Sequence, residues 1–248
     1  MAGHSKWSNI KRKKEKTDAQ KGKLFSKAAR EVTMAAKIGG EDPEQNARLR
    51  LAIQKAKEVN MPNDNIQRAI LKGAGKDGDA ASLEEVTFEA YATNGVALLI
   101  ETLTDNRNRT VPNLKNILNK GGGSMATIGS VSYMFNQKGV IIFEPGSPTD
   151  TIIDIATESN AEDIDIKDDE SIEVISAPND LEQIKTAFET KEISFATCDL
   201  LMIPDNYVST DSETAKKILS LIDKLEEDDD VQNVHSNLDF PEEILLED

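Results

Sequence analysis

The sequence predicts an α+β protein in which an N-terminal helical domain of three helices is followed by two α+β sheet domains, the third inserted in the second. Apolar residues first recur at helical spacing, and after the Gly-containing segment 73–81 they alternate as they do in strands. A final helix and strand would complete the sheet that the first strands begin. These observations predict domains at residues 1–77, at 78–136 plus 206–248, and at 137–205, the inserted one being ferredoxin-like.

The first 77 residues are predicted to form short amphipathic helices whose apolar faces make a small core. The first helix begins near residue 17 and ends at Gly39–Gly40, because glycine favours a helix end. Asp42–Pro43 is expected to open the second helix, since proline is favoured at the first helical position. Met61–Pro62 breaks the second helix, and a third follows with Arg68 and Lys72 directed outward.

Beyond residue 81 the pattern changes to strands and helices. Phe88–Ala92 and Val96–Leu103 are predicted strands, and Asn94–Gly95 between them is a strong hairpin signal. A helix is expected after Thr110, and Ser130–Phe135 is interpreted as a further strand. The elements predicted after these are, in order, strand Val140–Phe143, helix 152–156, strand Ile172–Ile175, helix 181–188, strand 198–202, helix 215–225 and strand Val231–His235.

Charge is distributed unevenly along the chain. The formal net charge of the whole chain is −16. Residues 1–76, however, hold 18 Lys and Arg against 8 Asp and Glu, whereas residues 77–248 hold 11 against 37. The first part therefore suits a polyanion such as nucleic acid. The acidic remainder is expected to keep the protein soluble or to dock a protein partner.

Residue content excludes several classes of protein. Cys198 is the only cysteine, so neither an intramolecular disulfide nor a cysteine-based zinc site can form, which fits a reducing cytoplasm. His4 and His235 are the only histidines, which nearly excludes catalytic groups built on histidine. Apolar runs such as Val96–Ile100 are far too short to span a membrane. We expect a cytoplasmic protein that is not an enzyme, with no cofactor, no metal and no membrane partner.

Two stretches match known motifs only in part. Gly73–Gly78 has the letters of a dinucleotide-binding fingerprint, but a helix precedes it and a linker follows it, which is the wrong context. The acidic stretch 163–170 departs from a calcium-binding loop, because Asp168 and Val174 stand where Gly and Glu are needed. This stretch and the acidic run 226–230 are interpreted as solvated surfaces.

The first candidate binding site is a basic arm that precedes the first helix. Each cation that neutralises a phosphate releases counterions, so binding through the arm would depend strongly on salt. The only tryptophan, Trp7, can stack on an unpaired base or, alternatively, pack against the helical domain. The predicted contact residues of the arm are His4, Lys6, Trp7, Lys11, Arg12, Lys13 and Lys14.

Two further candidate sites follow the arm. One is a basic face of the first helix; beside the arm it favours phosphate binding over a merely solvated surface. The other is a loop between a strand and a helix, whose Arg and Asn side chains suit phosphates and base edges. The alternative for the loop is that it satisfies its own backbone and pairs its Arg with carboxylates. The helix face consists of Lys16, Lys23, Lys27 and Arg30, and the loop contributes Asn106, Arg107 and Arg109.

Stretches spread along the chain carry a family resemblance. They are Met1-Ala-Gly-His-Ser-Lys-Trp, Lys21-Gly-Lys, Ala35-Ala-Lys-Ile-Gly-Gly, Asn46-Ala-Arg-Leu-Arg, Asn60-Met-Pro-Asn-Asp-Asn-Ile-Gln-Arg-Ala-Ile, Leu103-Thr-Asp-Asn-Arg-Asn-Arg-Thr-Val, Gly129-Ser-Val-Ser and Met202-Ile-Pro. On these motifs the chain resembles the YebC family of probable transcriptional regulators over essentially its whole length. It departs from the family pattern at Ala92-Thr-Asn-Gly, where a Gly-Pro-Gly-like turn is more common, and at Leu71-Lys72 after Ala69-Ile70, a position that is often basic in relatives.

The resemblance implies three domains, no enzymatic activity, and two hypotheses for function. Members are described as cytoplasmic DNA-binding transcriptional regulators, mitochondrial relatives as translational activators, and bacterial members have been linked to ribosomes. In the first hypothesis the arm and the basic helices contact duplex DNA, although no recognition helix for base edges is evident. In the second the arm enters ribosomal RNA, where unstacked bases suit Trp7. The sequence leaves both hypotheses open.

Overall fold

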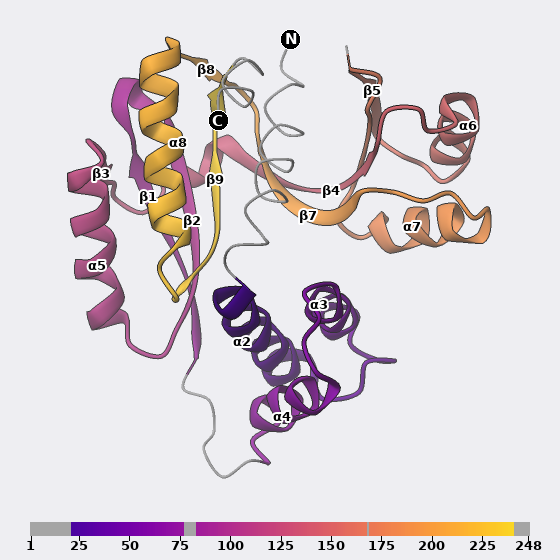
Figure 1. Cartoon of the computed structure of the whole chain (residues 1–248), viewed down its shortest axis with the longest axis horizontal. Helices are drawn as coiled ribbons and strands as arrows, with labels where there is room; N and C mark the ends of the chain where they lie inside the picture. The colour runs from indigo at the N-terminus through magenta and orange to yellow at the C-terminus, as the bar shows by residue number, and fades with distance from the viewer. Residues whose placement is uncertain (1–20, 77–82, 168, 241–248) are drawn as a thin grey trace.

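The computed structural model describes residues 21–76, 83–167 and 169–240. Within these residues, seven α-helices and three β-sheets form three units (Figure 1). A helical unit lies at the bottom of the view, a sheet unit on the left, and a second sheet unit on the right. This confirms the predicted α+β class, with helices first and the third unit inserted in the second. The residue limits assigned to the three domains stay a prediction.

Three helices pack into the helical unit: α2 (Lys21–Gly39), α3 (Ala47–Glu58) and α4 (Asn63–Gly73). Their apolar residues recur at helical spacing, so each helix buries one face against the others. The close approach of α4 to α2 depends on Gly73, where a Cβ would lie 2.2 Å from the carbonyl oxygen of Thr33. The buried core of the unit is Val32, Ala35, Ala36, Leu49, Ala52, Ala56, Met61, Ile66, Ala69 and Ile70.

The second of these helices begins later than predicted. Residues 43–45 form a turn, so the predicted start at Asp42–Pro43 is wrong. Asn46 caps the helix instead: its side chain accepts a hydrogen bond from the Leu49 amide at 3.0 Å. The same side chain donates to the carbonyl oxygens of Ala35 and Gly40, both at 2.8 Å. The cap and these long-range bonds together outweigh the local preference of proline for a helix start.

The first sheet is antiparallel, with the strand order β3-β1-β2-β9. The predicted hairpin is confirmed, because β1 and β2 are joined through a short turn in which Asn94 has a φ of 60°. Helices α5 and α8 pack on one face, and their apolar residues join those of the strands in one core. The elements are β1 (Glu84–Tyr91), β2 (Ala97–Thr104), α5 (Arg107–Lys120), β3 (Ser124–Met125), α8 (Ser212–Glu226) and β9 (Val231–Ser236).

The segment after β3 differs from the predicted strand at Ser130–Phe135. Residues 132–134 form a short 3₁₀ helix, and the next strand, β4 (Phe135–Phe143), begins only at its end. The buried carboxylate of Glu89 explains the difference. It accepts hydrogen bonds from the backbone amides of Gly129 at 2.7 Å, of Val131, and of Ser132 at 3.1 Å. These amides are therefore not available to a strand ladder.

The inserted unit has the element order strand, helix, strand, strand, helix, strand, which is that of a split βαβ motif. Its antiparallel sheet has the order β5-β6-β4-β7, and both helices pack on one face of it. Strand β5 lies in the acidic stretch that we interpreted as a solvated surface only. Besides β4, the elements are α6 (Thr149–Glu158), β5 (Asp163–Ile166), β6 (Ile172–Ser176), α7 (Leu181–Thr190) and β7 (Thr197–Pro204).

After the insertion the chain returns to the first sheet unit. A short parallel pair, β8 (Val208–Ser209) with β10 (Leu238–Asp239), flanks α8 and β9. Strand β9 pairs with β2, so the final helix and strand complete the first sheet as predicted. No helix in the described part of the chain has the length and apolar character needed to cross a membrane.

Candidate nucleic-acid interface

Most of the predicted contact residues lie outside the described residues. These are His4, Lys6, Trp7, Lys11, Arg12, Lys13, Lys14 and Lys16. The described part begins at α2 and holds the rest of the predicted basic helix face and the whole Asn-Arg loop. The geometry of the candidate interface is therefore that of α2, α4 and the start of α5.

The basic face of α2 lies against the acidic turn between α8 and β9, residues 226–230. The Lys23 ammonium donates to the carbonyl oxygen of Glu227 at 3.0 Å, and the Lys27 ammonium donates to that of Glu226 at 2.7 Å. Arg30 donates to the carbonyl oxygen of Leu103 at 2.9 Å. In this arrangement the three predicted contact residues on α2 are occupied within the molecule, and a phosphate would have to compete for them.

Asp230 is the centre of these contacts. Its side chain is 3% exposed and accepts hydrogen bonds from Arg30 at 2.6 Å and from Arg109 at 2.9 Å. The hydroxyl of Thr110 donates to it at 2.8 Å. Burial alone would raise the pKa of the Asp230 carboxyl, but the hydrogen bonds from Arg30, Arg109 and Thr110 outweigh burial and hold the pKa below its ordinary value. One buried carboxylate thus ties α2 to the start of α5 and to the turn before β9. We call this group the Asp230 network.

The predicted Asn-Arg loop divides into structural and open residues. Asn106 caps α5, since its side chain accepts a hydrogen bond from the Arg109 amide at 3.2 Å. Arg109 also pairs with Asp105 at 2.9 Å, which is the alternative we considered for this loop. Arg107 is exposed and makes no hydrogen bond or ion pair with the described part of the chain. Of these residues, Arg107 is therefore the one that a phosphate could reach without displacing a partner.

Helix α4 adds residues that we did not include among the predicted contacts. Arg68 and Lys72 lie one helical turn apart, and both are exposed. Neither forms a hydrogen bond or an ion pair with the residues that the structure describes. Their outward direction was predictable from the helical period. A role of Arg68 and Lys72 in binding was not predictable from the sequence, because it depends on which other residues lie beside α4 in the fold.

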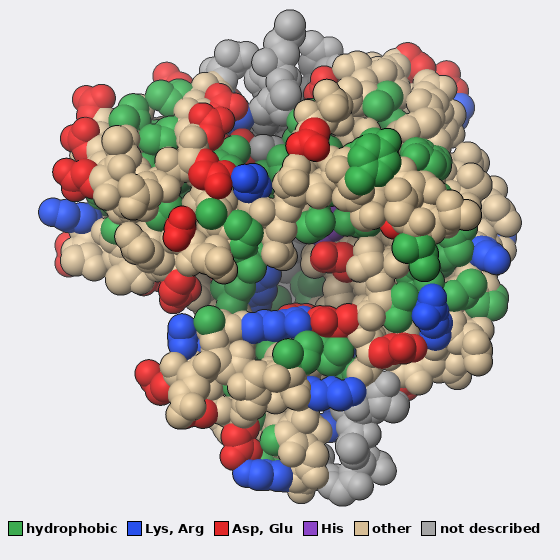
Figure 2. Space-filling view, turned by 180° about the vertical axis from the view of Figure 1, so that it is seen from behind, with side chains coloured by type: hydrophobic (Ala, Val, Ile, Leu, Met, Phe, Trp, Pro, Cys, Tyr) green, Lys and Arg blue, Asp and Glu red, His purple; other side chains and the backbone are tan. Residues whose placement is uncertain are grey.

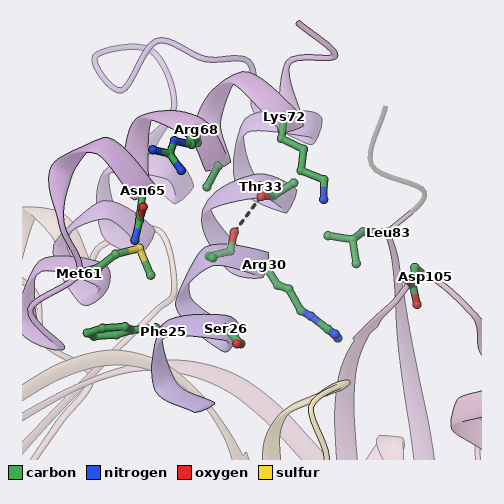
Figure 3. A pocket seen from close by; sticks show the side chains of 12 residues that line it. Phe25, Ser26, Arg30, Thr33, Met61, Asn65, Arg68, Lys72, Leu83 and Asp105 are labelled. Atoms are coloured by element: carbon green, nitrogen blue, oxygen red, sulfur yellow. Dashed lines mark hydrogen bonds between the residues drawn. The ribbon is translucent and has the colours of Figure 1, made fainter. Parts of the chain in front are cut away.

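A hollow of about 480 Å³ lies beside α4, between this helix, α2 and the start of the first sheet unit (Figure 3). Cationic side chains of both helices border it, and so does the carboxylate of Asp105. Apolar side chains line another part of its wall. The lining residues are Phe25, Ser26, Ala29, Arg30, Thr33, Met61, Asn65, Arg68, Ala69, Lys72, Leu83 and Asp105.

The distribution of charge separates this region from the inserted unit. Figure 2 shows the molecule from behind, with Lys and Arg side chains along the junction between the helical unit at the bottom and the sheet units above it. Asp and Glu side chains predominate on the unit at the upper left, which is the inserted one. The acidic side chains of the inserted unit would repel a polyanion.

Cys198 lies in β7 and His235 lies in β9. Within them, no three His, Cys, Asp or Glu side chains are placed to bind a metal ion. Burial raises the pKa of the Cys198 thiol to about 12, so at neutral pH it is protonated and a poor nucleophile. His235 in β9 lies 3.1 Å from Glu101 on the neighbouring strand β2, as in a cross-strand pair.

Comparisons with known proteins agree with the fold. The family model described as "TACO1/YebC protein N-terminal domain" matches residues 5–76, and the one described as "TACO1/YebC second and third domain" matches residues 83–238. A "probable transcriptional regulatory protein" of Maridesulfovibrio salexigens is 50% identical over 100% of this chain and 99% of its own. One of Moorella thermoacetica is 47% identical over 99% and 98%. The crystal structure of a conserved hypothetical protein from Aquifex aeolicus, 41% identical, superposes with a TM-score of 0.83 and covers 93% of this chain and 95% of its own.

Proposed function

Because the chain belongs to the TACO1/YebC family, whose members carry the name probable transcriptional regulatory protein, we propose that it regulates gene expression by binding nucleic acid. It acts in the cytoplasm and catalyses no reaction. The first candidate is a DNA-binding transcriptional regulator. Its nucleic-acid-binding surface is the side of the helical unit that α4 forms, extended by the predicted basic arm.

The observation that carries this proposal is the pair of open cations on α4. Arg68 and Lys72 are exposed and have no partner within the described residues, in contrast to Lys23, Lys27 and Arg30 of α2. Helix α4 follows α3 after the four residues 59–62, as the second helix does in a helix-turn-helix. In that motif the second helix enters the major groove, where Arg and Asn side chains can read base edges.

A salt titration of duplex DNA binding tests the proposal. Arg68→Ala with Lys72→Ala should weaken binding and reduce the slope of log affinity against log salt by about 0.9 for each lost phosphate contact. Lys57→Ala is the matched control, because Lys57 is an exposed cation on α3 that does not border the hollow. An affinity and a salt slope equal to those of the Lys57→Ala protein would overturn the assignment of α4.

A ribosome-associated translation factor that binds ribosomal RNA is the second candidate. The shape of the described surface favours this candidate. The cations Arg68 and Lys72, which are unpaired within the described residues, border a hollow, whereas Lys23 and Lys27 along α2 are hydrogen-bonded within the molecule. Co-sedimentation of the full-length protein with ribosomes at physiological salt, with excess duplex DNA as competitor, distinguishes the two. Sedimentation that survives the competitor, and that the α4 variant loses, supports the translation factor. If DNA strips the protein from ribosomes, the transcriptional candidate leads.

The acidic sheet units have a complementary role in this proposal. Like charge keeps them away from phosphates, so the molecule approaches nucleic acid with its helical unit first. Their outer surfaces are then free to dock a protein partner.

A further inference from the structure

The hollow beside α4 combines two surfaces of opposite character. Phe25 of α2 is half-buried, and Met61 and Ala69 are 5% and 6% exposed, so one part of the wall is apolar. Arg68 and Lys72 also border the hollow, with their charges open to solvent. Figure 3 shows Phe25, Met61, Asn65 and Arg68 on one side of the view, and Lys72 on the other side, next to Leu83. A ligand that fills this space therefore contacts both apolar and cationic side chains.

The volume and the polar groups narrow the class of ligand. A hollow of about 480 Å³ lies in the range of small-molecule sites, roughly 300–1,000 Å³. Asn65 on the rim can donate and accept hydrogen bonds through its amide. Asp105, which is paired with Arg109 at 2.9 Å, offers a carboxylate oxygen that accepts from an amino group or a hydroxyl. A nucleobase edge and a sugar present such partners, namely amino groups, hydroxyls and acceptor oxygens.

We propose that this hollow binds one unpaired nucleotide of a nucleic-acid strand. The base enters against Phe25 and Met61, and phosphates of the strand are held by Arg68 and Lys72. A paired base cannot reach the apolar wall, because in a duplex its faces are covered by stacking and its edge by its partner. The inference rests on the proposed function, since it takes nucleic acid as the ligand, and it goes with the candidate that binds ribosomal RNA, because duplex DNA offers no unpaired base.

A variant that fills the hollow without changing charge separates this proposal from simple phosphate attraction. Ser26 lines the hollow from an exposed position on α2, and within the described residues its hydroxyl donates to the Gly22 carbonyl oxygen, one turn before it, and to no other group. Ser26→Leu therefore adds an apolar side chain in the hollow and leaves Arg68 and Lys72 in place. Its thermal unfolding midpoint, compared with that of the unmodified protein, establishes that the variant is folded.

Binding of the full-length protein is measured by fluorescence anisotropy with an RNA hairpin that has an unpaired loop, a fully paired RNA of the same stem, a single-stranded DNA and a DNA duplex. Ser26→Leu should weaken the hairpin by about 5- to 150-fold, which corresponds to the roughly 1–3 kcal/mol of one stacked base. It should leave both duplexes unchanged. Arg68→Ala should weaken all ligands, and Lys57→Ala none. A loss with the hairpin but not with single-stranded DNA assigns the nucleotide to RNA, and a loss with both assigns it to any unpaired strand.

The other outcomes overturn the inference in distinguishable ways. If Ser26→Leu weakens paired and unpaired ligands equally, or neither, the hollow does not take a base, while an effect of Arg68→Ala still supports the proposed function. If no variant changes any affinity, the proposed function of α4 fails as well. If a free nucleoside monophosphate competes as strongly as the hairpin, the hollow is a site for a small ligand and not for a strand.

Discussion

Asp230→Asn is the perturbation that tests how the helical unit is held against the first sheet unit. The substitution keeps the shape of the side chain but removes its charge and one of its two acceptor oxygens. Asp230 accepts hydrogen bonds from Arg30, Arg109 and Thr110, and a fourth comes from Thr104 at 3.2 Å. The amide is neutral and cannot accept all four, so Arg30 loses the counter-charge of Asp230 and, among the described residues, Arg109 keeps only that of Asp105.

The exposure of the partners sets the size of the effect. Removing one member of a fully buried ion pair costs about 3–5 kcal/mol, whereas exposed pairs contribute about 0–1 kcal/mol. The side chain of Asp230 is 3% exposed, but those of Arg30 and Arg109 are 25% and 47% exposed, so water compensates both partners in part. We expect a loss of about 2–3 kcal/mol, which lies between these limits.

Urea unfolding followed by circular dichroism measures this loss. With a slope of roughly 1–3 kcal/mol per molar urea, the midpoint should fall by about 1 M. Hydrogen exchange should accelerate in α2 and at the start of α5, where the partners lie. Asp229→Asn is the matched control, because Asp229 is the exposed neighbour in the same turn. Equal midpoints for the two variants would refute the view that the Asp230 network joins the units.

Three further predictions concern single groups. The pKa of Asp230 lies below its ordinary value, so the contribution of this carboxylate to stability is complete above about pH 4 and is lost as the pH falls further. The stability of the Asp230→Asn protein should therefore depend less on pH below about pH 4 than that of the unmodified protein. An identical pH dependence of the two proteins would contradict this prediction. The Cys198 thiol, whose pKa is raised to about 12, should react with iodoacetamide at pH 8 far more slowly in the folded protein than in urea, and equal rates would contradict its burial. Gly73→Ala should lower the free energy of unfolding by about 1–3 kcal/mol, because the added Cβ would lie 2.2 Å from the Thr33 carbonyl oxygen. Gly22→Ala is the control and should not destabilise the protein, because its Cβ meets no atom within 4 Å. Equal effects of the two substitutions would show that α4 can move away from α2.

The spacing of apolar residues along the chain predicted those helices and strands in which buried positions recur at a regular interval. The hairpin at Asn94 and the final strand at Val231 follow from local signals, because a turn residue with positive φ and alternating apolar residues act over short distances. Errors occurred where a distant group decides the backbone. Asn46 bonds to Ala35, and Glu89 bonds to amides some 40 positions later, at Gly129 and beyond. A local pattern contains no information about such partners.

The same limit applies to the candidate site. The sequence correctly indicates that Lys27 and Arg30 share a helix face, but not that the face meets the turn that ends in Asp230, 200 residues away from Arg30. Arg68 and Lys72 were predicted to face outward without being assigned a role. Only the fold brings them to the same hollow as Phe25, and the role of the site follows from that proximity.

The strand pair that carries the inserted unit has a consequence for how such a chain can change during evolution. Strand β4 leaves at Phe135 and β7 returns at Pro204, and these two residues are opposite partners in the ladder. The exit and the entry of the insertion are therefore neighbours, and a short loop could join them in its absence, since the entropy of loop closure grows slowly with length. The insertion can be gained, lost or exchanged as one module while the strand order of the first sheet is preserved.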